Sequence, residues 1–401
     1  MAFVVQKFGG SSVADAAKIR RVAGIIADTY CEGNDVVVVL SAQGDTTDEL
    51  LEKAAEINPN SSKREMDMLL STGEQVSVAL CAMALEGMGL PVVSLTGWQI
   101  GMTTNSSYGN ARIKKVKGDR IRKELDKRRI VLVAGFQGLN KYEDITTLGR
   151  GGSDTTAVAI AAEMHADLCQ IYTDVDGVYT ADPRKVRGAK KLEEITYDEM
   201  LELASLGAQV LHNRSVELAK RYSVNLEVLS SYERKPGTKV KEVTKVEQTK
   251  ISGIAKDTNV ARIALVGLRD EPGIAFKVFR TLANAKINVD IILQSIGRGN
   301  TQDISFTVTE SDLAEAEKVL NKTKEAIGFE SMSIDSEVAK VSIVGAGMMS
   351  SSGIASLMFE ALYDSKTNIN MISTSEIKVS VLVREKDADR AVQAIHDKFF
   401  D

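Results

Sequence analysis

The sequence predicts an α/β domain followed by two small α+β units, and three observations lead to that fold class. Up to Ser230, short β-branched runs alternate with longer helical patterns, which is typical of a largely parallel sheet with helices on both faces. Near Glu233 the composition changes to turn residues and charged residues. Beyond this change, one order of strands and helices occurs twice, starting at Ala261 and again at Ala339.

The predicted elements of the first part alternate along the chain. The strands are Val4–Gln6, Val36–Ser41, Val92–Leu95, Ile130–Ala134, Leu168–Thr173 and Leu226–Leu229. The helices are Ala14–Tyr30, Glu65–Met88, Arg112–Lys127, Thr155–Ala162 and Val216–Tyr222. Ligands of such sheets bind beyond the carboxyl ends of the strands. We expect the residues that follow apolar runs to converge there, and these are Lys7, Ser41, Gly135 and Asp174.

The domain boundaries follow from the composition and from the repeat. Residues 233–260 are expected to form a linker, because Arg234–Thr238 is turn-like and the charged segment to Lys250 has little apolar periodicity. The first domain then covers residues 1–232, and the repeated units cover residues 261–335 and 338–401.

The two repeated units match at four points. Each has an apolar run, a Gly-Ile helix start, an Asn-rich strand and a later helix. The matching segments are Ala261–Gly267 with Ala339–Gly345, Gly273-Ile274 with Gly353-Ile354, Asn288–Ile291 with Asn368–Met371, and Asp312–Ile327 with Asp387–Phe399. The order is βαββαβ, a ferredoxin-like unit. The alternative is coincidental similarity, and the shared order, offset and Asn position argue against it.

The composition is that of a globular protein and excludes several classes. The net charge is −5 at pH 7 with no basic tract, which argues against nucleic acid or an acidic membrane as a partner. Cys31, Cys81 and Cys169 form no C-x-x-C pair, so neither structural zinc nor disulfides are expected, and a reducing cytoplasm fits best. The longest apolar runs have strand length, so no signal peptide or membrane span is predicted.

The segment Lys7–Val13 suits the binding of a phosphate. Lys7 supplies a cation, and Gly9 and Gly10 let backbone N–H groups approach an anion without obstruction. The helix expected from about Ala14 would point its positive N-terminal end at the same place. The spacing is not that of a Walker A loop. Taken alone, the motif favours an ordinary strand–turn–helix corner.

The segment Thr146–Ala157 is a second Gly-rich motif. Arg150 suits a bidentate grip on a carboxylate, and the N–H and hydroxyl groups at the helix start suit an anion. The alternative, at even odds, is a loop in which Asp154 only caps the helix.

The segment Tyr172–Arg184 suits a nucleotide, through its aromatic rings, its turn and Arg184. Asp174 and Asp176 resemble the start of an EF-hand, but the later glycine and glutamate are missing, so calcium is disfavoured. A plain surface turn is the alternative. Two weaker motifs are Ser41–Thr47, which follows a strand, and Thr72-Gly73-Glu74, which lies in a helical pattern.

Together these motifs resemble the aspartokinases, members of the amino acid kinase superfamily, and the C-terminal repeat is similar to paired ACT domains. Lys7–Val13 and Gly149–Ala157 are the most specific matches, and the resemblance covers essentially the whole chain. It implies an amino-acid-kinase-like three-layer sandwich in a monofunctional enzyme. The implied reaction uses ATP and Mg²⁺ to convert L-aspartate to 4-phospho-L-aspartate, which opens the route to lysine, methionine, threonine and isoleucine. The alternatives are a related kinase for glutamate, acetylglutamate, UMP or carbamate, and a non-catalytic amino-acid sensor.

The resemblance also implies roles for residues at matching positions. Lys7 and Asp154 would be catalytic, with Asp154 orienting Lys7. Aspartate would contact Thr47, Glu74, Arg150, Gly151, Gly152 and Ser153. ATP would contact Lys7, Phe8, Gly9, Gly10, Thr173, Asp174, Tyr179, Thr180, Ala181, Asp182, Pro183, Arg184 and Gln209, and no protein ligand to a metal is expected. Gln209 stands where relatives usually carry a lysine.

By the same resemblance, lysine and threonine are the expected effectors, bound where ACT domains meet in a homo-oligomer. Their site would use polar side chains buried beside a strand together with a helix start. The residues are Asp270, Gly273, Ile274, Asn288, Val289, Asp290, Gln294, Asn368, Ile369 and Asn370. The alternative is that these polar residues only satisfy strand edges and turns.

Overall fold

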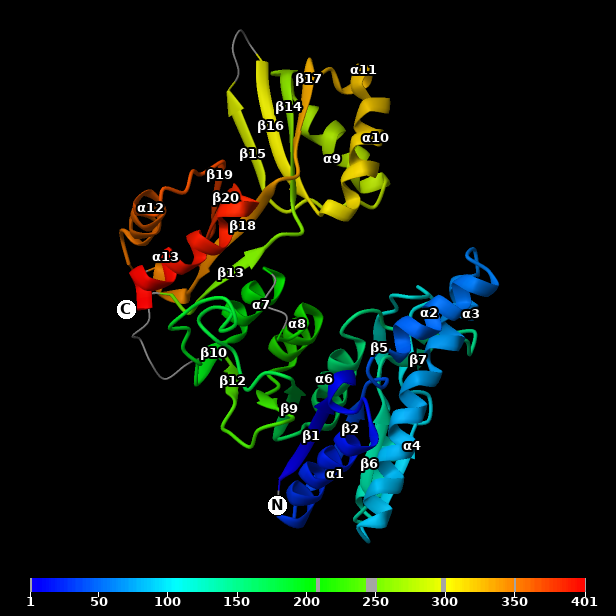
Figure 1. The fold of residues 1–401 in the computed structure, drawn as a ribbon. Helices are drawn as coiled ribbons and strands as arrows, with labels where there is room; N and C mark the ends of the chain where they lie inside the picture. Colours follow the sequence, from blue (N-terminus) through cyan, green and yellow to red (C-terminus); the bar gives the residue numbers. More distant parts are fainter. Residues whose placement is uncertain (1, 207–209, 243–250, 297–300, 350, 401) are drawn as a thin grey trace. The chain divides into compact units, whose positions relative to one another are not determined.

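The computed structural model describes residues 2–206, 210–242, 251–296, 301–349 and 351–400 (Figure 1). The chain divides into two compact units. The first unit comprises Met1–Val178, Lys191–Ser205 and Gln209–Val246. The second comprises Tyr179–Lys190, Leu206–Ala208 and Glu247–Asp401, so it includes a short segment from the first half of the sequence.

The first unit is built on an eight-stranded sheet in the order β10-β12-β11-β9-β1-β2-β6-β3. The strands are β1 (Phe3–Phe8), β2 (Asp35–Leu40), β3 (Val92–Leu95), β6 (Ile130–Ala134), β9 (Leu168–Thr173), β10 (Glu194–Thr196), β11 (Leu226–Ser230) and β12 (Thr238–Lys241). Neighbours pair in parallel except β11 with β12. The central strands are continuous apolar runs because both faces are covered: Val36–Leu40 is fully buried. The predicted largely parallel sheet is confirmed.

Different helices cover the two faces of this sheet, and the neighbouring residues Lys7 and Phe8 of β1 point to opposite faces. Phe8 lies in a cluster with residues of α1 (Ala16–Cys31) and α4 (Thr72–Gly87). Successive side chains of a strand point to opposite faces, so Lys7 faces the other side, where α6 (Gly152–Met164) packs on β1, β2 and β9. The other helices of the unit are α2 (Thr46–Ile57), α3 (Lys63–Leu70), α5 (Asp119–Leu125), α7 (Tyr197–Ser205) and α8 (Asn213–Tyr222).

Some predicted helices differ in the structure. Arg112–Lys127 is wrong in its first half, because Ile113–Lys115 forms β5 and the helix starts only after Gly118, whose φ is +68°. Strand β5 belongs to a small sheet with β4 (Thr103–Thr104), β7 (Gln137–Leu139) and β8 (Ile145–Thr147), which the sequence patterns did not indicate. The expected helix Glu65–Met88 is two helices that meet at Ser71, whose carbonyl accepts a hydrogen bond from Gln137 Nε2 (2.8 Å).

Within the described residues, one stretch is long and apolar enough to cross a bilayer by length and composition alone. It is Lys63–Gly87, which spans α3 and α4. Val78, Cys81 and Leu85 of this stretch are buried in the core cluster of the first unit. These residues pack against the sheet, while Val76, Leu80 and Met83 of the same helix are exposed.

The first repeat of the second unit has the predicted βαββαβ order. Its strands β14 (Ala261–Arg269), β15 (Ile292–Ile296), β16 (Thr301–Val308) and β17 (Ser331–Asp335) form an antiparallel sheet in the order β15-β16-β14-β17. Its helices are α9 (Ile274–Asn284), α10 (Leu313–Lys322) and α11 (Lys324–Ile327).

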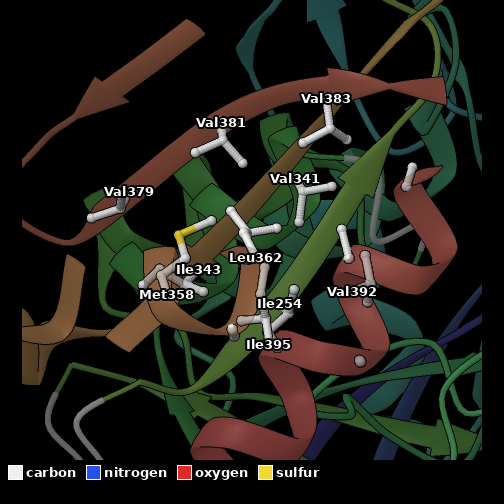
Figure 2. Close-up of a cluster of buried hydrophobic side chains, with 14 of the residues drawn as sticks. Ile254, Val341, Ile343, Met358, Leu362, Val379, Val381, Val383, Val392 and Ile395 are labelled. Atoms are coloured by element: carbon white, nitrogen blue, oxygen red, sulfur yellow. The ribbon is translucent and has the colours of Figure 1, made fainter. Parts of the chain in front are cut away.

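The second repeat takes its fourth strand from elsewhere in the sequence. It contains β18 (Val338–Val344), α12 (Ile354–Asp364), β19 (Met371–Thr374), β20 (Lys378–Arg384) and α13 (Ala388–Phe400). The sheet order is β13-β18-β20-β19, and β13 (Gly253–Asp257) precedes both repeats. The expected linker 233–260 therefore contains β12 and β13. Figure 2 shows Ile254 of β13 among Val341 and Ile343 of β18 and Ile395 of α13, so β13 completes this core.

Candidate active site

The end of β1 and the start of α6 meet in a buried ion pair. Lys7 Nζ lies 2.6 Å from Asp154 Oδ1, and the two side chains are only 11% and 12% exposed. Asp154 is in the first turn of α6, which follows Gly151 in the left-handed conformation. This pair holds a cation at the carboxyl edge of the sheet.

The Gly9-Gly10 turn after Lys7 brings backbone without side chains close to the Lys7 ammonium group. A Cβ atom on Gly10 would lie 2.7 Å from the carbonyl oxygen of Ala42, so the turn needs glycine there. The helix expected from about Ala14 is α1. The helix starts at Ala16, and its N-terminus is capped by Asp15, which accepts a hydrogen bond from Lys18 N (2.9 Å).

A cavity of about 590 Å³ opens beside the ion pair. Its lining includes the two catalytic candidates, the two glycines after β1 and all six residues expected to contact aspartate. These are Lys7, Asp154, Gly9, Gly10, Thr47, Glu74, Arg150, Gly151, Gly152 and Ser153. The structure thus brings residues from widely separated motifs to one cavity.

Glu74 is a buried carboxyl group in the wall of this cavity. The backbone N–H of Ala42 donates to Oε1 (3.3 Å), while Oε2 has no hydrogen-bond partner among the described residues. Burial raises the pKa of Glu74 to about 7. A buried carboxylate with an unused oxygen is suited to a cationic group of a ligand.

Arg150 lies in the Gly-rich loop Gly149–Gly151, just before α6, and its side chain is exposed at the cavity. Beside it, Gly151 has φ +69°, and a Cβ atom there would lie 2.2 Å from the ring of His212. Both features require glycine at this position. Burial lowers the pKa of His212, which leaves a neutral ring against the loop.

Thr173 and Asp174 lie beside the Gly9-Gly10 turn, because β9 pairs in parallel with β1 and Tyr172 is in register with Phe8. The carbonyl oxygen of Thr173 accepts a hydrogen bond from Ser231 N (2.9 Å). Phe8 does not offer its side chain to a nucleotide. Its ring is fully buried and stacks on Tyr172 with a centroid distance of 4.5 Å.

The residues Tyr179–Arg184 belong to the second unit and do not line the cavity. Ala181 is buried in the core of the second repeat, and Thr180 Oγ1 lies 2.9 Å from His396 Nε2 of α13. Arg184 pairs with Asp182 (3.0 Å). Gln209 lies outside the described residues.

The candidate effector residues are not buried as expected. Asp270, Gly273, Asn288, Asp290, Gln294 and Asn368 are exposed, Val289, Ile369 and Asn370 are half-buried, and Ile274 is in the apolar core. The expected strands at Asn288 and Asn368 start later, at Ile292 and Met371, because these asparagines lie in the connections from the preceding helices. Asp290 Oδ2 lies 2.5 Å from Lys340 Nζ, which joins the two repeats.

Two charged residues that hold the cavity wall were not identified from the sequence. Asp67 of α3 is fully buried, and Arg214 of α8 is partly buried against the loop before Arg150. Asp67 stands between Met66 and Met68 in an apolar stretch. A charged residue inside an apolar run is the sequence feature that could have identified it.

The chain is similar to known proteins over its whole length. Residues 2–230 match the amino acid kinase family, and residues 263–323 and 341–399 match the ACT domain. The aspartokinase of Corynebacterium glutamicum is 52% identical over 405 residues, which cover 100% of this chain and 96% of that protein. The aspartokinase of Geobacillus stearothermophilus is 52% identical over 400 residues, covering 100% and 97%.

Two solved structures of E. coli aspartokinase III are similar to this chain, and each match covers 100% of this chain and 100% of the E. coli chain. The complex with aspartate and ADP (R-state) is 27% identical with a TM-score of 0.83, and the complex with lysine and aspartate (T-state) is 26% identical with a TM-score of 0.76. With these matches over the whole length, the chain belongs to the aspartokinases, a group of the amino acid kinase family with ACT domains.

Proposed function

We propose that this chain transfers the γ-phosphoryl group of ATP to the side-chain carboxylate of L-aspartate, giving 4-phospho-L-aspartate and ADP. The observation that carries the proposal is that one cavity contains the Lys7–Asp154 pair, the unpaired oxygen of Glu74 and the exposed Arg150. The relative from E. coli whose structure is described with aspartate and ADP supports the same pair of ligands.

The chemistry needs positioning more than proton transfer. The nucleophile is a carboxylate with an ordinary pKa near 3.9, so it is ionised at neutral pH without a general base. The difficulty is to bring this anion to a polyphosphate, and Lys7 with the N-terminal turn of α6 supplies positive charge at that point. Asp154 keeps Lys7 in place.

The two charged groups on the α-carbon of the substrate are recognised by side chains of opposite charge. Glu74 receives the α-ammonium group on its unpaired Oε2, and Arg150 binds the α-carboxylate. This arrangement leaves the side-chain carboxylate free to face Lys7.

The nucleotide lies against Gly9, Gly10, Thr173 and Asp174, which the parallel pairing of β9 with β1 brings to neighbouring positions. The described residues contain no group of three or more acidic, His or Cys side chains that could hold a metal ion. Mg²⁺ bound together with ATP would neutralise part of the charge of the phosphates.

For the domains we propose a kinase domain over residues 1–232 and ACT domains over 261–335 and 338–401. Lysine, threonine or both act as feedback effectors at ACT interfaces of a cytoplasmic homo-oligomer, and the reaction is the first step toward lysine, methionine, threonine and isoleucine. The E. coli relative described with lysine and aspartate supports lysine as an effector.

The test is ADP release by the full chain with aspartate, glutamate, N-acetylglutamate, UMP or carbamate, with hydroxylamine present to trap an acyl phosphate. Turnover with aspartate alone, reduced by lysine, threonine or their mixture, is the expected result. Turnover with a different acceptor would assign another amino acid kinase activity, and lysine binding without any turnover would assign a sensor.

A further inference from the structure

The loop that carries Arg150 is held from one side by a buried carboxylate. Asp67 is fully buried, and its two oxygens accept hydrogen bonds from Gly109 N (3.0 Å to each) and from Thr147 N (2.9 Å). Thr147 Oγ1 donates a further bond to Oδ1 (2.7 Å). Asp67 thus ties the end of β8 to the separate segment around Gly109.

An arginine holds the same two segments from α8. Arg214 Nη1 donates to the carbonyl oxygen of Leu148 (2.5 Å), and Nη2 donates to that of Ala111 (3.0 Å). The two segments also bond directly, through Ala111 N and the carbonyl oxygen of Thr147 (2.8 Å). The residues just before Gly149 are therefore fixed by two charged side chains from different helices.

This support matters because Arg150 has no support of its own. The described residues provide no hydrogen-bond or ion-pair partner for its exposed side chain, so the position of its guanidinium depends on the backbone of Gly149–Gly151. Gly152 N donates to the carbonyl oxygen of Gly149 (2.9 Å), which closes the loop onto the start of α6. A shift at Thr147 or Leu148 would be passed directly to Arg150.

We propose that Asp67 and Arg214 are positioning residues for the substrate, which act through Thr147 and Leu148 to set the place of Arg150 in the acceptor half of the cavity. This inference rests on the proposed function, in which Arg150 binds the α-carboxylate of aspartate. Neither residue contacts the reacting atoms.

Electrostatics distinguishes this role from a simple charge in the wall. Aspartate carries two carboxylates, so the negative charge of Asp67 near the cavity opposes its binding. If charge were the main effect, the neutral variant Asp67→Asn would lower the KM for aspartate. If positioning dominates, the same variant raises that KM, because the amide replaces one of the two acceptor oxygens by a donor, and at least one of the hydrogen bonds from Gly109 and Thr147 is lost in either orientation.

The experiment measures the KM for aspartate, the KM for ATP, kcat and the melting temperature of the full chain. Asp67→Asn and Arg214→Lys are each expected to raise the KM for aspartate by about 10- to 100-fold, the effect of a small misplacement, and to change the KM for ATP by less than about threefold. Two milder variants change only Thr147. Thr147→Val removes the hydroxyl bond to Asp67 and is expected to raise the KM for aspartate. Thr147→Ser keeps this bond and is expected to have the KM of the wild type. This pair decides the matter if the larger changes prevent folding.

The control is Glu124→Gln in α5. Glu124 is also a buried carboxylate, paired with Arg120 and Arg129 (both 2.9 Å), but it does not line the cavity. It is expected to lower the melting temperature with both KM values unchanged. An unchanged or lowered KM for aspartate in Asp67→Asn and in Thr147→Val would overturn the inference. Failure of the wild-type chain to use aspartate would instead overturn the proposed function.

Discussion

Lys7 and Asp154 form an ion pair of 2.6 Å that joins the end of the central strand β1 to the first turn of α6. The pair lies at the carboxyl edge of the sheet, where parallel α/β folds bind ligands. Because both side chains are almost buried, the ammonium group has little freedom. It is thereby aimed at the cavity in which we place the transferred phosphoryl group.

Replacement of Asp154 by Asn is expected to lower kcat by about 10- to 100-fold, because Lys7 loses the carboxylate that fixes its position. Steady-state ADP release with saturating aspartate measures this. The matched control is Asp15→Asn, which keeps an N-cap acceptor on α1 and should leave kcat unchanged. Equal activity of the two variants would remove Asp154 from the mechanism.

The binding of aspartate is expected to depend on pH through Glu74. Burial raises the pKa of this carboxyl group to about 7, so at pH 6 it is mostly protonated and cannot pair with an ammonium group. The KM for aspartate should therefore fall by up to about tenfold as the pH rises from 6 to 8, and level off above pH 8. Initial rates at several pH values check this.

The stability of the ligand-free chain should show the opposite trend at this residue. Between pH 4.5, the ordinary pKa of a glutamate side chain, and about pH 7, the folded state keeps a proton that the unfolded state has released. The free energy of unfolding contributed by Glu74 therefore falls as pH rises across that interval. Glu74→Gln should remove both this slope and the pH dependence of the KM. Slopes that persist in the variant would assign them to another group.

Replacement of Gly151 by Ala is expected to damage the acceptor side of the cavity. The residue has φ +69°, which costs an L-residue about 1 kcal/mol, and the new Cβ would overlap the ring of His212. The melting temperature should fall and the KM for aspartate should rise. Gly24→Ala is the control, since nothing lies within 4 Å of a Cβ at that position in α1, and it should be neutral or stabilising.

Replacement of Asp290 by Asn is expected to weaken inhibition by lysine by about tenfold or more. The reason is that the effector loses a charge-assisted hydrogen bond from its ammonium group to the Asp290 carboxylate. The concentration of lysine that halves the activity measures this. Asp387→Asn is the control, since Asp387 pairs with Arg390 (2.7 Å) on the surface of the second repeat. If both variants respond to lysine like the wild type, Asp290 has no part in the effector site.

The strands of the first unit were predictable because buried parallel strands are short runs of β-branched residues. Val92–Leu95, Ile130–Ala134 and Leu168–Thr173 match the structure residue for residue. The fourth strand of the second repeat was not predictable in this way. β13 lies before both repeats in the sequence, and only its pairing with β18 in the folded chain assigns it to that sheet.

The residues that converge on the cavity were recognisable as motifs, but their environments were not. Nothing in Thr72-Gly73-Glu74 indicates that Glu74 is buried with one unpaired oxygen. The partner of Asp290 likewise depends on tertiary structure, since Lys340 follows fifty residues later in a different repeat. Burial and long-range pairing are properties of the packed chain, and local patterns carry little information about them.

The central claim is that Lys7 bridges donor and acceptor in the phosphorylation of aspartate. The most direct measurement is aspartate-dependent formation of the trapped acyl phosphate by Lys7→Ala and by the wild type, at saturating ATP and aspartate. We expect active wild-type protein and a loss of about 100- to 1000-fold in kcat for the variant, as for removal of one preorganised charge-stabilising group. Near-normal turnover by Lys7→Ala would contradict it.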